Sequence, residues 1–363
     1  MRKCLIISAS NIQNVRIRKN LFYFLKDKFD DLKFVGDFLA ESDINQIVWK
    51  GAYNRGGKIK EIIIFLKLLK IIIYNKPSHV ISFAPKVNIY CGLISRFLNY
   101  KHAAVISGLG SMSKQITTEN SFYHKLFFLS LNKSNLTITM NKENYSFFRS
   151  KLNNNLVKKI PSEGLNTKIQ NNSKKNDNFK YLLYLSRIIS EKGIFIIIDA
   201  FKNLKKTNPE LKLLIAGEMS LSDKQEKPKF FEEIKFQDIE YLGEVSENLK
   251  MNLLEKSDIV LLPSMYGEGL PMILLEAQLY ESLIITTDVT GCRDAVPDFL
   301  KEYAFTEFST KSLSEKIINY ISFDTKKLNF LKKNSKKWVK ENHDFENINN
   351  IYNNIFKENN FFN

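Results

Sequence analysis

The sequence predicts an α/β protein built from two doubly wound, parallel-sheet domains, and three observations lead to this prediction. The chain has 363 residues, which at ~150 residues per domain allows two domains that each bury a core. Short apolar runs of strand length alternate with longer helix-like segments in both halves, as expected for repeated βαβ units. The polar stretch 171–178 has no apolar anchor and is the best candidate for a linker between the halves.

The predicted elements alternate along the chain in the order strand, loop, helix. In the first half we expect strands at 3–8, 79–83, 103–106 and 136–140, and helices at 15–29, 58–74, 89–98, 119–133 and 142–152. In the second half we expect strands at 181–185, 212–216, 259–262 and 283–287, and helices at 194–206, 270–280, 310–322 and 326–341. Apolar residues with helical spacing after residue 343 predict a last helix, with a frayed tail at 359–363.

The composition argues against several classes of protein. Hydrophobic residues make up 44% and charged residues 26% of the chain, which is ordinary for a globular protein. The three cysteines are far apart and form no Cys-x-x-Cys pair, so we expect neither disulfides nor a zinc site. The four histidines show no ligand spacing and no Asp-x-Asp pair is present, so no metal site is predicted. The first ten residues turn polar too soon for a signal peptide, and no apolar run approaches the ~20 residues of a spanning helix.

Positive charge is concentrated in the first half of the chain. Residues 1–175 contain 29 Lys and Arg against 10 Asp and Glu, whereas residues 176–363 contain 25 against 29. The net charges are therefore +19 and −4, which together give the +15 of the whole chain. Such a basic half predicts an anionic partner, which can be nucleic acid, an anionic membrane surface or a phosphorylated acceptor.

The segment 58–74 leaves two interpretations open. Lys60, Lys67 and Lys70 share part of one helical face, while Ile and Leu fill the rest. One interpretation is a basic amphipathic helix that touches anionic lipid. The other is a helix packed on the sheet with a solvated lysine stripe, and the runs of Ile also permit a β-strand.

The stretch 264–287 is the part around which the second half is organised. A strand ends before it, a glycine-containing loop follows, and a helix begins with Pro271 near its first position, where a missing N–H costs nothing. The N-terminus of that helix offers free N–H groups and a positive dipole end, which suit an anion such as a diphosphate. Glu276 in the helix can accept hydrogen bonds from a ribose diol, and Glu268 in the loop can reach a sugar held outside the helix.

These residues resemble a known signature. Glu268-x7-Glu276, within Glu-Gly-Leu-Pro-Met-Ile-Leu-Leu-Glu-Ala, is similar to the donor-site signature of retaining glycosyltransferases of family 4, which have the GT-B fold. The resemblance implies two Rossmann-like domains that face a cleft, with a C-terminal helix that crosses back to the first domain. We accordingly expect an acceptor-binding domain at 1–168, a nucleotide-sugar-binding domain at 176–342 and the returning helix at 343–363.

Other motifs of the second half fit the same resemblance. Arg187 and Lys192 flank the start of a predicted helix and are similar to the Arg-x4-Lys donor motif of the family. Arginine can bind a diphosphate in a bidentate manner, and lysine acts as a point charge. The segment 241–245 resembles the part of these enzymes that packs on the nucleotide base. The further donor contacts that we expect are Gly269, Leu270, Pro271, Gly217, Glu218, Leu242 and Val245.

In the first half the resemblance narrows to a subgroup. Pro-Lys-x-Asn-Ile-Tyr at 85–90, followed by Ser107-Gly-Leu-Gly, is similar to bacterial transferases that add N-acetylhexosamines to undecaprenyl-diphosphate-linked sugars, of the N,N′-diacetylbacillosaminyl-diphospho-undecaprenol N-acetylgalactosaminyltransferase type. Many members of family 4 place a histidine where this chain has Ser107, so we assign no catalysis there. The acceptor contacts that we expect are Lys86, Asn88, Gly108, Gly110 and Arg16. For Lys86 a surface lysine remains the alternative, and for Gly108 and Gly110 a tight turn without a ligand.

The resemblance implies a retaining glycosyltransferase that moves a sugar from a UDP-sugar to a lipid-diphosphate-linked glycan in surface polysaccharide synthesis, and its subgroup implies an N-acetylhexosamine. Arg187, Lys192 and the helix dipole would stabilise the leaving diphosphate without a metal or other cofactor, while Glu268 positions the donor sugar. We therefore expect Glu268, Arg187 and Lys192 to be the catalytic residues. The expected location is the cytoplasmic face of the inner membrane, to which the basic first domain would bind.

Two other functions remain open. A UDP-N-acetylglucosamine 2-epimerase on the same fold would need acids or histidines that converge on the sugar, and the scarcity of histidines argues against it. A nucleic-acid-binding protein would fit the basic half, but little aromatic interleaving supports it.

Overall fold

The computed structural model describes residues 1–9, 12–37, 44–52, 57–119, 121–152, 156–168, 180–221 and 223–362, with only the backbone at 12–17, 58 and 111. The chain divides into two compact units, which we describe separately. The first comprises Met1–Gly164, Gly267–Leu270 and Phe345–Asn363, and the second comprises Leu165–Tyr266 and Pro271–Asp344. The predicted linker at 171–178 lies outside the described residues.

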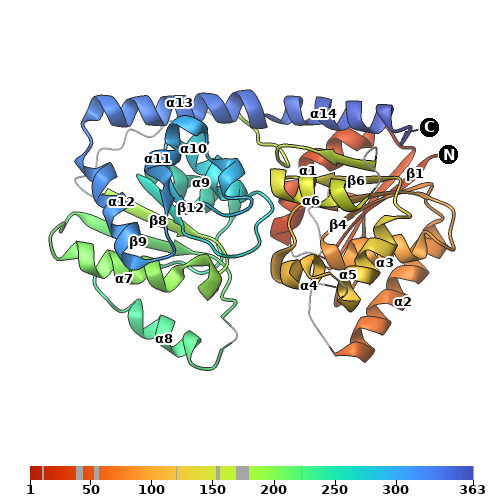
Figure 1. Ribbon diagram of the computed structural model, residues 1–363, viewed down its shortest axis with the longest axis horizontal. Coiled ribbons are helices and arrows are strands. Elements are labelled where there is room, and N and C mark those ends of the chain that lie inside the picture. Colours follow the sequence, from red (N-terminus) through yellow and green to blue (C-terminus); the bar gives the residue numbers. More distant parts are fainter. Residues whose placement is uncertain are drawn as a thin grey trace. The chain divides into compact units, whose positions relative to one another are not determined.

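The first unit is built on a parallel sheet (Figure 1). Over the described residues this sheet has seven strands in the order β3-β2-β1-β4-β5-β6-β7. Its central strands are near-continuous apolar runs because both faces of the sheet are covered by other elements. The strands are β1 (Lys3–Ser8), β2 (Asp31–Gly36), β3 (Gln46–Val48), β4 (His79–Phe83), β5 (Lys101–Ile106), β6 (Leu136–Thr139) and β7 (Val157–Lys159).

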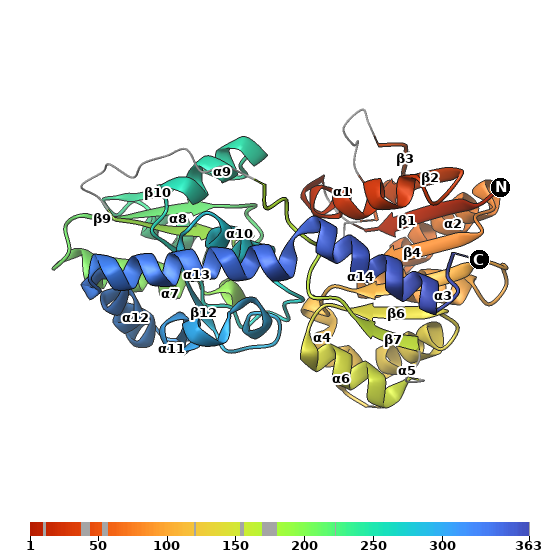
Figure 2. The same cartoon turned by 90° about the horizontal axis from the view of Figure 1, so that it is seen from above.

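Helices cover both faces of this sheet. Alternate residues of β1 point to opposite faces, so that Cys4 and Ile6 join one core and Leu5 and Ile7 join another. The first core is closed by α1 and α14, which lie on the same face of the sheet (Figure 2), and the second is closed by α2 and α3. The helices of this unit are α1 (Ile12–Lys26), α2 (Lys58–Asn75), α3 (Pro85–Ile94), α4 (Ser113–Thr117), α5 (Phe122–Leu131), α6 (Lys142–Lys151) and α14 (Phe345–Glu358).

The second unit repeats the plan with a parallel sheet, of six strands within the described residues, in the order β10-β9-β8-β11-β12-β13. Its strands are β8 (Lys180–Leu185), β9 (Leu211–Ala216), β10 (Ile239–Tyr241), β11 (Ile259–Leu262), β12 (Leu283–Thr287) and β13 (Phe305–Thr306). Its helices are α7 (Ile194–Lys205), α8 (Glu226–Glu233), α9 (Glu247–Lys256), α10 (Met272–Leu279), α11 (Lys301–Ala304), α12 (Thr310–Ser322) and α13 (Thr325–His343).

Each sheet contains one place where the strand order reverses. The neighbours there are β1 and β4 in the first unit, and β8 and β11 in the second. The connections that leave these two strands run in opposite directions, which opens a space beyond their carboxyl ends, and open α/β sheets bind their ligands there. Residues that bind ligands are therefore expected directly after these four strands.

The predicted fold class is confirmed, and the differences lie at the ends of elements. Strands β4, β11 and β12 and helix α12 have the predicted bounds. The segment 58–74 is helical, so the strand interpretation was wrong. The helix predicted at 89–98 begins earlier, at Pro85, because proline is favoured in a first turn, where its missing N–H costs nothing. The helix predicted at 119–133 is shorter, since Ser121 caps α5 by accepting a hydrogen bond from the His124 N–H at 3.0 Å.

No helix among the described residues is long and apolar enough to cross a membrane.

Candidate functional site

The loops that follow β8 and β11 are held together at the point where the order of the second sheet reverses. The two strands pair in parallel, with Leu182 opposite Ile259. Beyond their ends, the Met265 N–H donates to the Glu191 carbonyl at 2.7 Å. Gly193 has φ +77°, and a Cβ at this position would lie 2.5 Å from the carbonyl oxygen of Pro263. Only glycine fits so close a contact with that backbone conformation.

Two cationic side chains meet over one aromatic ring at this place. The guanidinium carbon of Arg187 lies 5.4 Å from the centre of the Tyr266 ring, and Lys192 Nζ lies 5.7 Å from it. Lys192 is only 8% exposed and donates a hydrogen bond to Ser186 Oγ at 2.9 Å. The Tyr184 hydroxyl donates to the Arg187 carbonyl at 2.6 Å and so fixes the backbone that carries the guanidinium. The predicted pair of cations is thus brought together, and such a pair can bind an anion.

Helix α10 starts in the loop after β11. Pro271 is its N-cap residue, with φ −70° and ψ 103°, and the first helical residue is Met272. The sequence placed Pro271 near the first helical position, and the structure moves it one step outside the helix. The first N–H groups of a helix have no intrahelical partner, so the start of α10 adds a second attraction for an anion at the ends of the reversal strands.

The carboxylate of Glu276, on α10, is engaged by a lysine of another helix. Lys250 Nζ lies 2.8 Å from Glu276 Oε1 and 2.6 Å from Glu247 Oε1. Burial alone would lower the pKa of Lys250, but the two carboxylates outweigh it and raise that pKa above its ordinary value. Lys250 therefore holds Glu276 in one position. Sequence reasoning did not predict Lys250, because this residue lies far from Glu276 in the sequence, on a different helix, and belongs to no motif.

The other predicted donor contacts of the second unit gather at the end of β9. Gly217 has φ +143°, and a Cβ there would lie 1.9 Å from the Ser186 carbonyl oxygen, so the loops after β8 and β9 touch through their backbones. The Gly217 N–H donates to the Gly243 carbonyl at 2.7 Å, and the Tyr241 hydroxyl donates to the Gly217 carbonyl at 3.1 Å. Glu218, Leu242 and Val245 in these segments are half-buried.

In the first unit, the predicted glycine loop packs on the segment Gly267–Leu270. The Gly110 N–H donates to the Gly267 carbonyl at 3.0 Å, and Asn141 Nδ2 donates to the Gly269 carbonyl at 2.9 Å. A Cβ on Gly108 would lie 2.6 Å from the Gly269 nitrogen. The absence of a side chain at Gly108 is therefore required for backbone packing. A ligand contact at Gly108 or Gly110 remains a prediction. Glu268 and Leu270 belong to the same segment.

Two of the predicted acceptor contacts have structural partners instead. Asn88 is fully buried, and its carboxamide accepts from Ser82 Oγ at 2.7 Å and donates to the Val105 carbonyl at 3.0 Å. Its side chain joins β4 to β5 and offers nothing to an acceptor, so that prediction needs correction. Lys86 Nζ pairs with Glu61 at 2.9 Å, which neutralises the charge expected to meet a phosphate. Arg16 lies in α1, but its side chain is outside the described part of the chain.

A buried ion pair that sequence reasoning missed lies beside the end of β1. Arg18 Nη1 donates to Ser8 Oγ at 2.7 Å, and the guanidinium carbon lies 4.3 Å from the centre of the Phe83 ring, at the end of β4. Arg18 Nε is 3.7 Å from Glu163 Oε1, and both side chains are buried. Burial raises the pKa of Glu163 to about 7, although the nearby Arg18 charge acts in the opposite direction. No short-range spacing links these residues, which explains why no motif indicated them.

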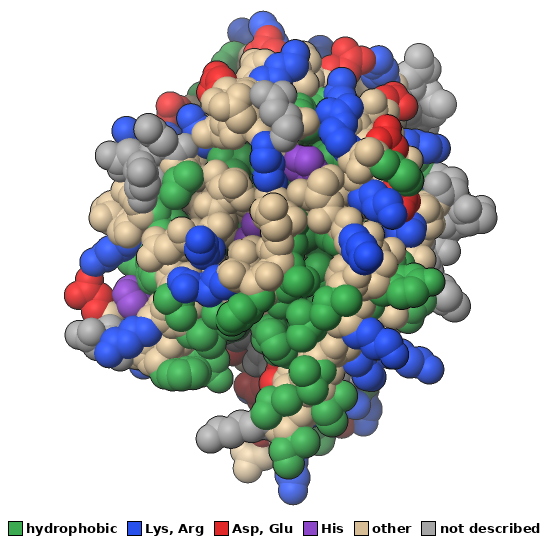
Figure 3. All heavy atoms as spheres, turned by 90° about the vertical axis from the view of Figure 1, so that its right-hand side faces the viewer, with side chains coloured by type: hydrophobic (Ala, Val, Ile, Leu, Met, Phe, Trp, Pro, Cys, Tyr) green, Lys and Arg blue, Asp and Glu red, His purple; other side chains and the backbone are tan. Residues whose placement is uncertain are grey.

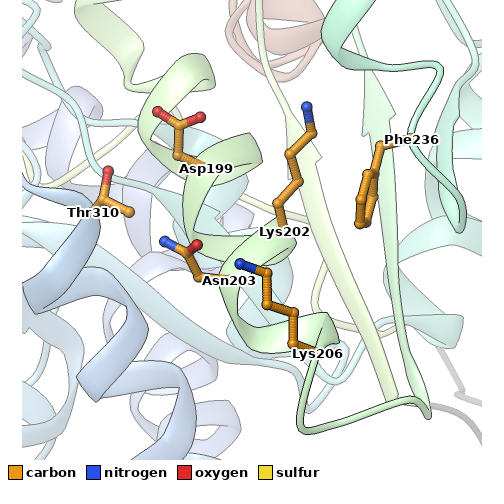
Figure 4. Close-up of a pocket in the computed structure, with 6 residues that line it drawn as sticks. All are labelled: Asp199, Lys202, Asn203, Lys206, Phe236 and Thr310. Carbon is orange, nitrogen blue, oxygen red and sulfur yellow. The ribbon is translucent and has the colours of Figure 1, made fainter.

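A shallow depression of about 570 Å³ lies elsewhere on the second unit, over α7. Figure 4 shows its lining side chains on and beside this helix, with Asp199, Lys202 and Asn203 on α7 and Lys206 directly after it. It contains none of the predicted site residues. Lys202 is already paired with Glu233 and stands over the Phe236 ring, 5.4 Å from its centre. We assign no ligand to this depression.

Comparison with known protein families and structures identifies a family match in the second half of the chain and a shared fold. Residues 166–338 match the family described as Glycosyl transferases group 1. Over its full length the chain has the GT-B fold of glycosyltransferases, with a TM-score of 0.79 to Anabaena HepE in complex with UDP and glucose. That alignment covers 99% of this chain and 100% of the other at 15% identity, and it therefore bears on the fold alone.

Two curated relatives illustrate the range of the sequence similarity. The capsular polysaccharide biosynthesis glycosyltransferase CapM of Staphylococcus aureus is 26% identical over 40% of this chain, and the match spans only 38% of CapM. The N,N′-diacetylbacillosaminyl-diphospho-undecaprenol alpha-1,3-N-acetylgalactosaminyltransferase of Campylobacter jejuni is 26% identical over 74% of this chain and 74% of its own length.

Proposed function

We propose that this protein is a glycosyltransferase that takes its sugar from a UDP-sugar. The observation that carries the proposal is the pairing of Arg187 and Lys192 over Tyr266, at the reversal point of the second sheet and beside the strand that leads into α10. A nucleotide diphosphate needs cations and free N–H groups in one place, and this place supplies both. The family match over residues 166–338 and the UDP in the HepE structure support this choice of ligand.

The ribose is assigned to Glu276. A carboxylate accepts hydrogen bonds from a vicinal diol, and Lys250 orients this carboxylate through Oε1. Oε2 and the remaining lone pairs of Oε1 are the acceptors for the two ribose hydroxyls. The uracil is assigned to the backbone around Leu242, next to Gly217.

The proposed chemistry is transfer with retention of configuration. The bond between the anomeric carbon and the diphosphate oxygen breaks, an acceptor hydroxyl forms the new glycosidic bond on the same face, and its proton passes to the leaving phosphate. Arg187, Lys192 and the N-terminus of α10 stabilise the negative charge that develops on that phosphate. Glu268 positions the donor sugar. These groups can do this without a divalent ion, so we propose that the reaction is independent of metal.

The acceptor is proposed to be a lipid-diphosphate-linked glycan, and the donor sugar an N-acetylhexosamine. The similarity to the Campylobacter jejuni N-acetylgalactosaminyltransferase supports both assignments. The basic first half suits the diphosphate of such an acceptor and an anionic membrane surface, and so supports a location on the cytoplasmic face of the inner membrane.

Replacement of the arginine tests the donor site. Arg187→Ala removes a bidentate donor, and a hydrogen bond to a charged group contributes about 1.5–3 kcal/mol, so we expect UDP to bind at least about tenfold more weakly. Isothermal titration calorimetry with UDP measures this effect, and mass spectrometry of a lipid-diphosphate acceptor incubated with UDP-sugars measures transfer. Lys235→Ala is the control, because Lys235 is 69% exposed and pairs with Glu232 on the surface.

Three results would contradict the proposal. Arg187→Ala with the turnover of the unmodified protein would remove the role of the cations. A loss of transfer in excess EDTA would contradict metal independence. Formation of an epimer from UDP-N-acetylglucosamine without acceptor, detected by NMR, would favour the epimerase alternative.

A further inference from the structure

Helix α2 presents apolar side chains on both of its sides. Ile64, Leu68 and Ile72 recur every four residues and are buried in the core of the first unit. At 100° per residue, the opposite side of the helix is also apolar. We call it the α2 outer face, and it consists of Ile59 (77% exposed), Ile62 (59%), Ile63 (48%), Leu66 (53%), Ile73 (51%) and Tyr74 (86%).

Neither sequence interpretation described this arrangement fully. A helix that only packs on a sheet buries its apolar side chains and exposes polar ones, whereas here the exposed side is mainly Ile and Leu. Figure 3 shows hydrophobic side chains gathered on a protruding part of this side of the molecule, with Lys and Arg side chains beside them. A contiguous exposed apolar surface of this kind marks a place of interaction.

The charges beside the α2 outer face indicate the partner. Lys60, Lys67 and Lys70 are exposed along the same helix. The sequence of α2 contains one acid, Glu61, which is turned toward the unit and pairs with Lys86 at 2.9 Å. The outer face therefore combines apolar side chains with positive charge alone. If two copies of this chain met through this face, their basic first halves, each of net charge +19, would repel each other, which opposes self-association here.

We propose that the α2 outer face inserts into the interface of an anionic membrane. The helix would lie in the plane of the interface, with Ile and Leu among the acyl chains and the lysine ammonium groups at the lipid phosphates. The inference rests on the proposed function in one respect: a lipid-linked acceptor would give the protein a reason to bind a membrane. It identifies α2 as the element of the basic first unit that meets the membrane.

Sedimentation of the full chain with vesicles tests the inference. Vesicles of phosphatidylethanolamine and phosphatidylglycerol should bind the protein, and vesicles of phosphatidylcholine should bind it much less. Ile62→Glu with Leu66→Glu replaces two apolar anchors by charges that the acyl chains exclude, so the partition coefficient should fall at least about tenfold. Lys67→Gln with Lys70→Gln should weaken binding to anionic vesicles by about fivefold per lysine. Ile318→Glu, at a 46% exposed position of α12, is the matched control and should bind as the unmodified protein does.

Two outcomes would overturn the inference. One is unchanged vesicle binding by the Ile62→Glu, Leu66→Glu variant. The other is a dimer in light scattering that this variant converts to monomer, which would make the face a contact between copies. UDP titration of the same variant separates the two proposals, because the α2 outer face contains no donor-site residue. Vesicle binding without UDP binding would refute the proposed function and leave this inference standing.

Discussion

At the scale of single residues, the pair of Arg18 and Glu163 makes the stability of the first unit depend on pH. Burial raises the pKa of Glu163 to about 7, against about 4.3 for a glutamate in an unfolded chain. Arg18, which Ser8 holds by a hydrogen bond, and Tyr352 interact electrostatically with Glu163, and Glu163 Oε2 has no hydrogen-bond partner among the described residues. At pH values between these two pKa values, the carboxyl group of Glu163 keeps its proton in the folded state and has lost it in the unfolded state.

The sign of the effect follows from this difference in bound protons. Because the folded state binds more protons, the free energy of unfolding falls as pH rises from about 4.3 to about 7, and the contribution is lost above that range. Glu163→Gln cannot ionise, so the slope that Glu163 contributes should disappear in this variant. Glu232→Gln, at an exposed surface pair, is the control and should keep the slope of the unmodified protein.

Tryptophan fluorescence can follow the first unit alone. The chain has two tryptophans, and Trp49 is buried in the first unit, whereas Trp338 lies in α13. In a Trp338→Phe background, urea unfolding curves at pH 5, 6, 7 and 8 report on the surroundings of Trp49. Equal slopes in Glu163→Gln and its parent would show that another group titrates.

The residues of the candidate site divide into those that a motif reveals and those that only the fold brings together. Arg187, Lys192 and Glu276 stand in short motifs next to predicted strands and helices, so their types and spacing sufficed to select them. Lys250 reaches Glu276 from a different helix, and Arg18 meets Glu163 from a distant part of the sequence. Such contacts depend on how distant helices and strands pack together, and this packing cannot be predicted from the local sequence. Asn88 shows the reverse error, since a motif residue proved to be a buried structural one.

At the scale of elements, the sequence predicted best where an element is long or apolar enough to form without its neighbours. Helix α12 and strand β11 have their predicted bounds for this reason. Strand β3 was not predicted, because it has only three residues, and its apolar run is limited to Ile47 and Val48. It exists through pairing with β2, where Ile47 lies opposite Val35. Short edge strands thus depend on a partner that lies elsewhere in the sequence.

The N-terminus of α7 is the element on which the geometry of the cations depends. Gly193 caps this helix with φ +77° and touches Pro263, so Gly193→Ala introduces both backbone strain and a clash. A left-handed conformation costs a residue with a Cβ about 1–2 kcal/mol, and the clash adds to this. We expect Gly193→Ala to lower the stability of the second unit by at least about 2 kcal/mol and to weaken UDP binding, because Lys192 is the preceding residue.

Substitution of a second glycine in the same unit distinguishes the cost of the steric clash from the cost of the backbone strain. Gly243 has φ +65°, and a Cβ there meets no atom within 4 Å. Gly243→Ala should therefore show the cost of strain alone. Hydrogen exchange of peptides from 180–221 measures both variants. Protection that falls equally in the two would mean that the contact with Pro263 has no energetic importance.

At the scale of the whole molecule, the first unit is assembled from both ends of the chain. Helix α14 places Ile348, Tyr352 and Phe356 in the core that β1 and α1 also form. Arg2 Nη1 donates to the Phe362 carbonyl at 3.1 Å, and Lys101 Nζ donates to the Asn360 carbonyl at 2.6 Å. The first unit therefore cannot complete its core until α14 and Phe361 have been made.

Phe356→Ala tests how far the first unit depends on this terminal helix. The side chain is fully buried and its ring lies 4.8 Å from that of Phe361, so its removal leaves a cavity among aromatic neighbours. Buried Phe→Ala changes cost about 3–5 kcal/mol, and this cost should appear in the unfolding of the first unit, followed by Trp49 fluorescence in the Trp338→Phe background. Phe330→Ala, at a 59% exposed position of α13, should change the midpoint little, since exposed sites of this kind alter stability by about 0.5 kcal/mol or less. If the Trp49 transition stays in place in Phe356→Ala, the C-terminal helix is an appendage of the first unit rather than part of its core.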